Sequence, residues 1–166
     1  MTYYLGLGTN LGDKEANLHT AIREIGERVG RVTRVSSFLT TEPWGFVSEN
    51  RFLNAVVEVE SESGPMEVLL RTQAIEHRMG RTRKSTDGGY ADRLIDIDIL
   101  LCFTPEGKSV SIDTPELRLP HPQICRRPFV TEPLRQLGVS FSTSEPGVPT
   151  YLSPRVGLPK LAYRLT

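Results

Sequence analysis

The stretch Arg93–Leu101 constrains the fold of this chain more than any other part of the sequence. Branched apolar residues recur in it at every second position, a pattern typical of a β-strand. Residues two apart in a strand point to the same face of the sheet. The apolar residues that we expect on one face, against the core, are Ile95, Ile97, Ile99 and Leu101. Asp96 and Asp98 are then predicted to share the opposite face.

Two carboxylates side by side on such an apolar strand need compensation. They repel each other and lose hydration unless a cation or hydrogen bonds replace the water. Oxygen ligands of this kind suit Mg²⁺, and a pair of them can bridge two metal ions about 3.5–4 Å apart that clamp a phosphoryl group. Asp96 and Asp98 are therefore candidate metal ligands. The alternative is a pair of surface aspartates on a half-exposed sheet.

The totals favour a single domain in the cytoplasm. The chain of 166 residues is long enough for one core, and its 20 basic residues balance 20 acidic ones. No global field then draws it to nucleic acid or to a membrane surface, and no apolar run reaches the ~20 residues of a membrane span. We expect no signal peptide, and we expect Cys102 and Cys125 to be reduced thiols.

The order of predicted elements is βαββαβ. The elements that precede the aspartate strand are a strand over 3–8, a helix from Asp13 to Val29, a strand over 32–38, a strand over 52–60 and a helix over 64–79. This order is typical of a ferredoxin-like α+β fold, an antiparallel sheet with both helices on one face. The free face would carry the aspartates and the bare Gly6 and Gly8.

The remaining segments are predicted to be less regular. Residues 40–50 are expected to form a long loop, and residues 126–137 to hold a short helix. We place a domain over 1–139 and an irregular C-terminal tail over 140–166. The segment Gly6–Gly12 follows a strand and precedes a helix, but its third glycine is one position late for a dinucleotide fingerprint, so a tight turn is favoured.

Basic and aromatic side chains flank the predicted site. Arg81, Arg83 and Arg93 surround the polar loop before the aspartates, and arginine forks match phosphate oxygens. Together with metal-binding carboxylates they suggest a polyphosphate ligand, although an ordinary basic loop is the alternative. Two further groups of residues are candidate ligand contacts. The polar residues Gln73, Glu76, His121 and Arg127 could contact a phosphate-bearing ligand, or they could be ordinary surface or structural residues. A flat heteroaromatic ring could be bound by Trp44, Phe52, Asn54 and Phe129, and the alternative is that the aromatic residues belong to the core.

Nine short stretches in order resemble the 6-hydroxymethyl-7,8-dihydropterin pyrophosphokinase family of folate biosynthesis. They are Leu7–Gly12, Ser36–Phe38, Thr41–Gly45, Phe52–Ala55, Gln73–Glu76, Gly80–Arg83, Arg93–Leu100, Leu119–Pro122 and Arg127–Phe129. The resemblance covers residues 3–138. It implies a Mg²⁺-dependent enzyme of ferredoxin-like fold that transfers the β,γ-diphosphate of ATP to the pterin hydroxymethyl group and releases AMP.

The resemblance also implies roles for individual residues. Two Mg²⁺ ions would be held by Asp96 and Asp98, which with Arg81 and Arg93 would form the catalytic group. The positions that match ATP contacts are Gln73, Glu76, Arg83, Arg93, His121 and Arg127. The positions that match the pterin pocket are Thr41, Trp44, Phe52, Asn54 and Phe129. The loop over 81–92 would close over ATP, with Tyr90 as the candidate to pack on the nucleotide.

The expected partners are ATP and a reduced pterin, without nucleic acid or membrane, in a monomer or weak homodimer. Two other functions fit parts of the pattern. A non-catalytic ferredoxin-like module would bind a small ligand without paired metal ligands. A two-metal nuclease would use Asp96 and Asp98, but the neutral net charge and the lack of an extended basic stripe argue against it.

Overall fold

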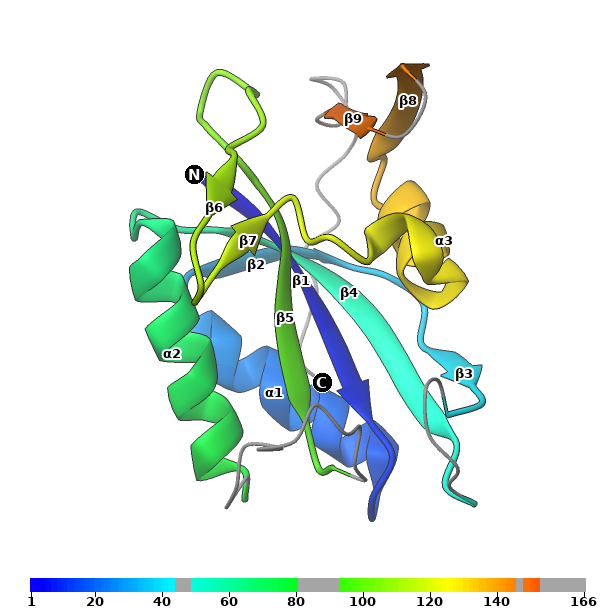
Figure 1. Ribbon diagram of the computed structural model, residues 1–166. Helices are drawn as coiled ribbons and strands as arrows, with labels where there is room; N and C mark the ends of the chain where they lie inside the picture. The colour runs from blue at the N-terminus through cyan, green and yellow to red at the C-terminus, as the bar shows by residue number, and fades with distance from the viewer. Residues whose placement is uncertain (44–48, 81–92, 146–147, 153–166) are drawn as a thin grey trace.

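An antiparallel sheet forms the centre of the molecule (Figure 1). The computed structural model describes residues 1–43, 49–80, 93–145 and 148–152. The strands of the sheet are β1 (Thr2–Thr9), β2 (Arg31–Val35), β3 (Leu39–Thr41), β4 (Phe52–Glu60) and β5 (Asp96–Phe103). They run in the order β2-β4-β1-β5, and β3 pairs with β4. The predicted α+β class with an antiparallel sheet is confirmed.

Helices cover the sheet, and two short strand pairs form small sheets of their own. The helices are α1 (Lys14–Arg28), α2 (Pro65–Arg78), the 3₁₀ helix η1 (Ile124–Arg126) and α3 (Pro128–Gln136). The strand pairs are β6 (Ile112–Asp113) with β7 (Arg118–Leu119), and β8 (Ser140–Glu145) with β9 (Val148–Leu152). No helix among the described residues is both long and apolar enough to cross a membrane.

The starts of α1 and α2 follow from local sequence signals. Asp13 lies just before α1, and its carboxylate accepts a hydrogen bond of 3.0 Å from the Ala16 N–H. Pro65 opens α2, where its missing N–H leaves no donor unpaired. Gly80, with φ at +106°, follows the end of α2. Both helices were predicted at these places.

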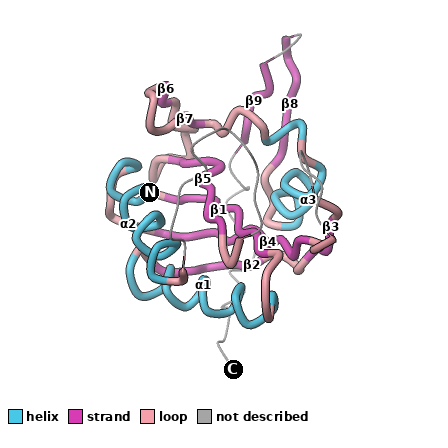
Figure 2. The backbone as a smooth tube through the Cα atoms, turned by 60° about the horizontal axis from the view of Figure 1, so that its bottom comes forward, coloured by secondary structure: helices cyan, strands magenta, loops and turns pink. Residues whose placement is uncertain are grey.

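The main core lies between the sheet and the helices α1 and α2 (Figure 2). Alternate residues of each central strand point into it, because side chains alternate between the faces of a strand. Its fully or nearly buried strand members are Tyr3, Leu5, Leu7, Ala55, Val57, Val59, Ile97 and Ile99. The predicted apolar faces of β1 and β4, and most of that of β5, are confirmed.

A second core lies on the opposite face of the sheet, under α3. Tyr4 and Val56 of the sheet pack there with Val130 and Leu134 of α3. The predicted helix within 126–137 is therefore present, and it covers part of the face expected to be free. The part of this face next to α3 remains open and carries the site described below.

The alternation along β5 changes at one point, which makes the prediction for Leu101 wrong. Leu5 of β1 pairs with Ile99, but Tyr4 pairs with Leu101, so Leu100 is an extra residue on β5. Such a β-bulge shifts the alternation by one residue. Leu101 consequently lies in the second core and not beside Ile99.

The segment after β2 also differs from expectation. β2 ends at Val35, because the Ser36 side chain replaces a backbone partner: its Oγ accepts a hydrogen bond of 2.9 Å from the Val56 N–H. The chain then forms β3, which pairs Thr41 with Phe52. The predicted strand over 32–38 is thus shorter, and the loop expected over 40–50 begins inside a strand.

The tail over 140–166 is not irregular throughout. Its first part forms an antiparallel pair, in which Ser140 of β8 is opposite Leu152 of β9. The serine- and threonine-rich composition suggested an extended tail, and such residues are also compatible with a hairpin. Residues 153–166 lie outside the described part of the chain.

Candidate active site

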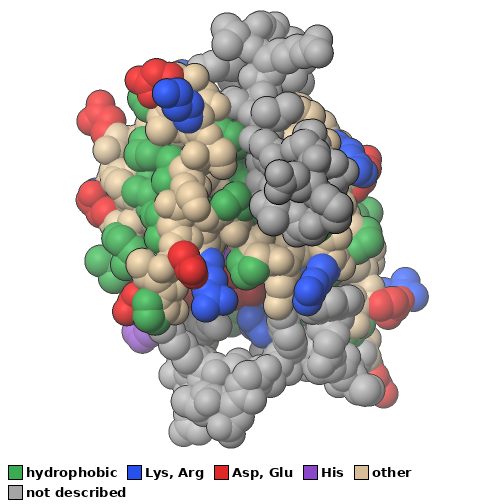
Figure 3. Space-filling view, turned by 45° about the horizontal axis from the view of Figure 1, so that its top comes forward, with side chains coloured by type: hydrophobic (Ala, Val, Ile, Leu, Met, Phe, Trp, Pro, Cys, Tyr) green, Lys and Arg blue, Asp and Glu red, His purple; other side chains and the backbone are tan. Residues whose placement is uncertain are grey.

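A cleft opens on the α3 side of the sheet, over the backbone of Gly6 and Gly8. The space within it is about 650 Å³, with the open solvent at its mouth included. Neither glycine has a side chain, and the Leu100 side chain lies over Gly6, where its Cδ1 would be 3.2 Å from a Cβ. Figure 3 shows basic and acidic side chains gathered around a hollow in this part of the surface.

Most of the predicted site residues that the structure describes line this cleft. They are Thr41, Phe52, Asn54, Arg93, Asp96, Asp98, Arg127 and Phe129. They come from β3, β4, β5 and α3, and from the residues that precede β5 and α3. Sequence reasoning missed the contributions of Leu100 and Val130, which show no signal apart from being apolar.

The register of the sheet places the acidic residues and the residues predicted to bind a ring on either side of β1. Gly8 is paired with Asn54 on one side and with Asp96 on the other. Gly6 is likewise paired with Asp98. Because neighbouring strands lie about 4.8 Å apart, Asn54 and Asp96 are about 10 Å apart across the bare strand. A ligand lying over the glycines can reach both sides.

Each aspartate faces an arginine. Arg93 Nη1 lies 3.1 Å from Asp96 Oδ2, and Arg127 Nη1 lies 3.8 Å from Asp98 Oδ2. Both guanidinium groups are mostly buried, with side-chain exposures of 14% and 11%. Buried arginines of this kind can exchange a carboxylate partner for phosphate oxygens, to which their planar forks are matched.

The surroundings of Asp98 disfavour a negative charge on its carboxyl group. Burial and the neighbouring charge of Asp96 raise the pKa of Asp98 to about 7, although Arg127 opposes the shift. A divalent cation between the carboxylates would remove this repulsion, and two carboxylates with substrate oxygens and water make a suitable Mg²⁺ shell. No group of three acidic, histidine or cysteine residues able to hold a metal occurs in the described part of the chain. The two carboxylates that are present fit a cation whose other ligands come from water and a phosphate-bearing ligand.

Glu76 and Gln73 lie on α2, beside the cleft and not in its lining. Glu76 is buried, and its Oε1 accepts a hydrogen bond of 2.7 Å from the Ile97 N–H. Because β5 is an edge strand, this N–H points away from the sheet ladder. Gln73 is half-buried, one helical turn before Glu76.

His121 lies next to β5 and is neutral at physiological pH. Its backbone N–H donates to the Leu100 carbonyl at 2.9 Å, which fixes its place. Burial and the charge of Arg127 lower the pKa of His121 to about 4. Its Nδ1 accepts from the Gln123 N–H at 3.3 Å, so the ring proton is on Nε2. His121 is then a neutral hydrogen-bond donor.

The side of the cleft that is predicted to bind a ring is built on β3 and β4. The Asn54 side-chain amide donates to Thr41 Oγ1 at 2.8 Å, which leaves its carbonyl oxygen toward Gly8. The rings of Phe52 and Phe129 complete this side. The Arg127 guanidinium lies 5.9 Å from the centre of the Phe129 ring. Arg127 also faces Asp98, so it lies between the aromatic and the acidic sides of the cleft.

Four predicted residues lie outside the described part of the chain. They are Trp44, Arg81, Arg83 and Tyr90. The predicted closure of the loop over 81–92 lies there too.

Comparisons with known proteins agree with this geometry. The family model of the 7,8-dihydro-6-hydroxymethylpterin-pyrophosphokinases (HPPK) matches residues 4–139. A 2-amino-4-hydroxy-6-hydroxymethyldihydropteridine pyrophosphokinase of Porphyromonas gingivalis is 51% identical over 131 residues, 79% of this chain and 86% of that protein. One of the same name from Aquifex aeolicus is 34% identical over 155 residues, 92% of this chain and 87% of that protein. The latter match reaches beyond residue 139 into the tail.

A solved structure supports the fold alone. Its title is "Crystal Structure Analysis of the HPPK-DHPS in complex with substrates", and its TM-score to this chain is 0.57 at 16% identity. The match covers 82% of this chain and 40% of that one. The family model and the P. gingivalis relative cover most of the chain, and together they show that it belongs to the 7,8-dihydro-6-hydroxymethylpterin-pyrophosphokinase family.

Proposed function

We propose that the cleft over Gly6 and Gly8 is the active site in which this chain performs the reaction of its family. The chain is an ATP-dependent pyrophosphokinase of folate biosynthesis that transfers a diphosphoryl group to hydroxymethyldihydropterin. One observation carries the assignment of the site. The strand pairing puts Asn54 and Asp96 on opposite sides of Gly8, so a ring-binding side and an acidic side meet over bare backbone.

Asp96 and Asp98 are the proposed holders of two Mg²⁺ ions. The raised pKa of Asp98 supports this role, because the site as built disfavours two negative charges without a cation. Mg²⁺ bound there would neutralise triphosphate charge and polarise the β-phosphoryl group. The remaining ligands would be phosphate oxygens and water, as Mg²⁺ prefers.

The ring-binding side would hold the pterin with its hydroxymethyl group toward the aspartates. Asn54 offers a carbonyl acceptor to the heterocycle, and Phe52 and Phe129, with Trp44, would enclose its faces. Thr41 would fix the orientation of the Asn54 amide through their hydrogen bond of 2.8 Å. Holding the alcohol in line with the β-phosphorus supplies much of the rate of such a reaction.

In the transfer, the hydroxymethyl oxygen forms a bond to the β-phosphorus. The bond from this phosphorus to the oxygen of the α-phosphate breaks, its electron pair leaves with AMP, and the hydroxyl proton passes to solvent. Asp98 is the proposed hydrogen-bond acceptor of the hydroxyl. Arg93 and Arg127 would turn from their carboxylate partners to phosphate oxygens, and His121 would donate through Nε2.

The other proposed ATP contacts are Gln73, Glu76 and Arg83, with Arg81 as a further catalytic arginine. Their support is the match to the family pattern. The strand order β2-β4-β1-β5 supports a ferredoxin-like arrangement. The cytoplasmic location and the state as monomer or weak homodimer stay predictions.

The test is the product of ATP under three conditions. ATP is incubated with the purified chain and Mg²⁺, with and without 6-hydroxymethyl-7,8-dihydropterin, and with the pterin after chelation of the metal. We expect AMP and a pterin diphosphate only when all components are present. Release of ADP, or AMP formation without the pterin, would contradict the proposal. Binding of a pterin without any turnover would instead favour the non-catalytic module.

A further inference from the structure

We infer that Asn10 is a positioning residue for Arg93, an inference that rests on the proposed function of the cleft. The two residues form a reciprocal pair of hydrogen bonds. The Asn10 backbone N–H donates to the Arg93 carbonyl at 3.1 Å. The Arg93 backbone N–H donates to Asn10 Oδ1 at 2.7 Å. Both main-chain polar groups of Arg93 are therefore held by one residue.

Asn10 acts on the site through Arg93, because its own side chain does not reach the cleft. It is 2% exposed, and it is not among the residues that line the cleft. Arg93 lies three residues before the start of β5 at Asp96, where the strand ladder has not yet begun. The two hydrogen bonds to Asn10 hold the Arg93 backbone where strand pairing does not. They thereby position the Arg93 guanidinium relative to Asp96.

The turn that carries Asn10 is itself fixed. The side-chain amide of Asn17, on α1, donates to the Leu11 carbonyl at 2.8 Å and to Thr9 Oγ1 at 3.2 Å. Thr9 is fully buried at the end of β1. Asn10 is thus held between the end of β1 and the start of α1, and Arg93 is positioned relative to these two elements.

A hydrophobic side chain next to Arg93 packs against the turn after β1 and the end of α2. Leu94 follows Arg93, and its side chain packs against both Gly12 and Gly80. A Cβ at Gly80 would come within 2.9 Å of Leu94 Cδ1, and the positive φ angles of both glycines disfavour other residues. The glycine-rich turn after β1, which resembled a dinucleotide fingerprint, is accounted for as the anchor of the segment that delivers Arg93.

The first test is amide hydrogen exchange, which reports on the hydrogen bond from the Arg93 N–H to Asn10 Oδ1 and does not require enzymatic activity. In the wild-type chain the Arg93 amide should be protected. Asn10→Ala removes the acceptor and should speed its exchange at least tenfold. Asn10→Asp keeps an acceptor oxygen at the same place and should keep the protection. Equal protection in the wild type and Asn10→Ala would overturn the inference, as would loss of protection in Asn10→Asp.

The second test is a double-mutant cycle on the turnover of ATP and pterin. Misplacing Arg93 should lower kcat by about 10- to 100-fold in Asn10→Ala, more than it raises KM. If Asn10 acts through Arg93, then Asn10→Ala in the Arg93→Ala background should change kcat less than threefold. Multiplying losses in the double variant would show that Asn10 only supports the fold, and the inference would be wrong.

A matched control separates stability from positioning. Ser61 is also a buried polar residue, whose Oγ donates to the Val29 carbonyl at 2.6 Å, at the opposite end of β4 from the cleft. Ser61→Ala should destabilise the chain without lowering kcat; an equal fall of kcat in Ser61→Ala and Asn10→Ala would overturn the inference. If the wild-type chain releases no AMP, the proposed function fails, and the exchange experiment still decides whether Asn10 holds Arg93.

Discussion

Glu76 Oε1 accepts a hydrogen bond of 2.7 Å from the backbone N–H of Ile97, the residue between the two aspartates of the cleft. Glu76 is 6% exposed and belongs to α2, so a helix carboxylate is bound directly to the edge of the strand that carries the acidic pair. The same carboxylate adds to the charge around Asp98. After burial and the charge of Asp96, it is a further cause of the raised pKa of Asp98.

Glu76 should therefore affect both the strand and the acidity of the site. Glu76→Gln keeps an acceptor oxygen and removes the charge, so the fold should survive and the pKa of Asp98 should fall from about 7 in metal-free protein. Glu76→Ala leaves the Ile97 N–H without this acceptor and should lower the free energy of unfolding by about 1–3 kcal/mol. Carboxyl NMR titration and urea unfolding measure the two effects. An Asp98 pKa that stays or rises in Glu76→Gln would contradict the electrostatic part.

Asp96→Asn and Asp98→Asn test the metal ligands at nearly constant volume. Each removes a negative charge needed to hold Mg²⁺, and we expect diphosphoryl transfer to fall at least ~100-fold while the fold survives. Asp113→Asn is the control, because Asp113 lies on β6 with its side chain 85% exposed. Steady-state rates at saturating Mg²⁺ decide the matter: near-normal turnover in either cleft variant would sink the two-metal assignment.

The sequence predicted those parts of the fold that depend on local patterns. The period of two along β4 and the Asp13 cap of α1 each depend on a few neighbouring residues, and both appear as expected. The bulge at Leu100 could not be predicted in this way. It depends on how β5 is paired with β1, and only the far partner reveals the extra residue.

The same distinction between local patterns and long-range pairing applies to the candidate site. Residue types and spacing pointed to Asp96, Asp98 and the arginines, because paired carboxylates on an apolar strand are unusual. That Gly8 has Asn54 on one side and Asp96 on the other depends on the register of two separate strand pairs. The role of Asn10 was missed for the same reason, since its partner is 83 residues away in the chain.

Asn54→Ala should weaken pterin binding and spare ATP binding. The variant removes the acceptor that faces the glycine floor and the donor to Thr41, at the side of the cleft remote from the aspartates. Loss of a buried hydrogen-bonding partner predicts a decrease in pterin affinity of about tenfold or more. Calorimetric titration with each ligand separately is the measurement. An equal loss of affinity for both ligands would mean that Asn54 supports the fold and does not recognise the substrate.

Gly8→Ala should have a similar effect through crowding. A Cβ at Gly8 would lie 3.1 Å from Asn54 Oδ1 and 3.7 Å from Phe52 Cδ1, so the amide must shift away from its place. We expect weaker pterin binding with the fold retained. Gly64→Ala is the control, because a Cβ there meets nothing within 4 Å. Unchanged pterin affinity in Gly8→Ala would show that the floor of the cleft is not in contact with the ring.

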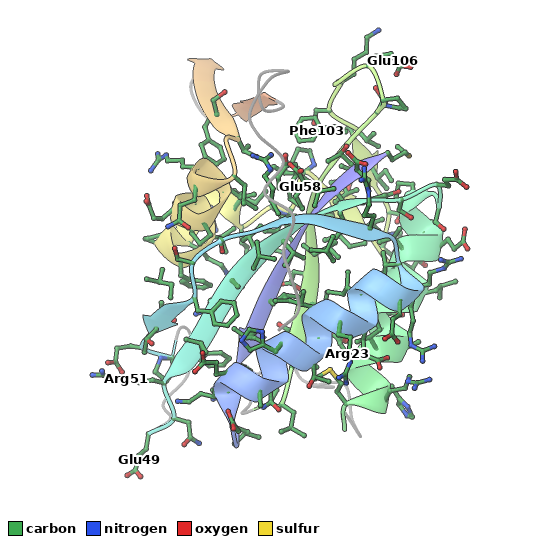
Figure 4. All side chains as sticks on the ribbon, turned by 180° about the vertical axis from the view of Figure 1, so that it is seen from behind. Arg23, Glu49, Arg51, Glu58, Phe103 and Glu106 are labelled. Atoms are coloured by element: carbon green, nitrogen blue, oxygen red, sulfur yellow. The ribbon has the colours of Figure 1, made fainter. Side chains whose placement is uncertain are left out.

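A buried ion pair away from the cleft should govern the acid stability of the chain. Figure 4 shows Glu58 toward the end of the sheet opposite Glu49 and Arg51. Glu58 Oε1 accepts from Thr33 Oγ1 at 2.6 Å and from Arg34 Nε at 3.1 Å, and Tyr4 donates to Glu58 Oε2 at 2.6 Å. Burial opposes the charge of Glu58, but these hydrogen bonds outweigh it and lower the pKa of the carboxyl.

The sign of the pH effect follows from that lowered pKa. The folded chain binds the Glu58 proton less readily than the unfolded chain, whose carboxyl titrates near pH 4.3. Glu58 therefore contributes stability at neutral pH, and this contribution is lost as the pH falls below about 5 and through the folded-state pKa. Glu58→Gln should lower the free energy of unfolding at pH 7 by about 3–5 kcal/mol, because it leaves Arg34 buried without a counter-charge. It should also flatten the acid side of the stability curve.

Glu60→Gln is the matched control on the same strand. The ion pair of Glu60 with Arg31 is more exposed, with side-chain exposures of 33% and 68%, so its loss should cost about 0–1 kcal/mol. Urea unfolding of the three proteins between about pH 3 and pH 8 provides the comparison, because this range includes the pH at which the contribution of Glu58 begins to be lost. If Glu58→Gln kept the full acid dependence of the wild type, or cost no more than Glu60→Gln, the carboxylate of Glu58 would not be the group that sets acid stability.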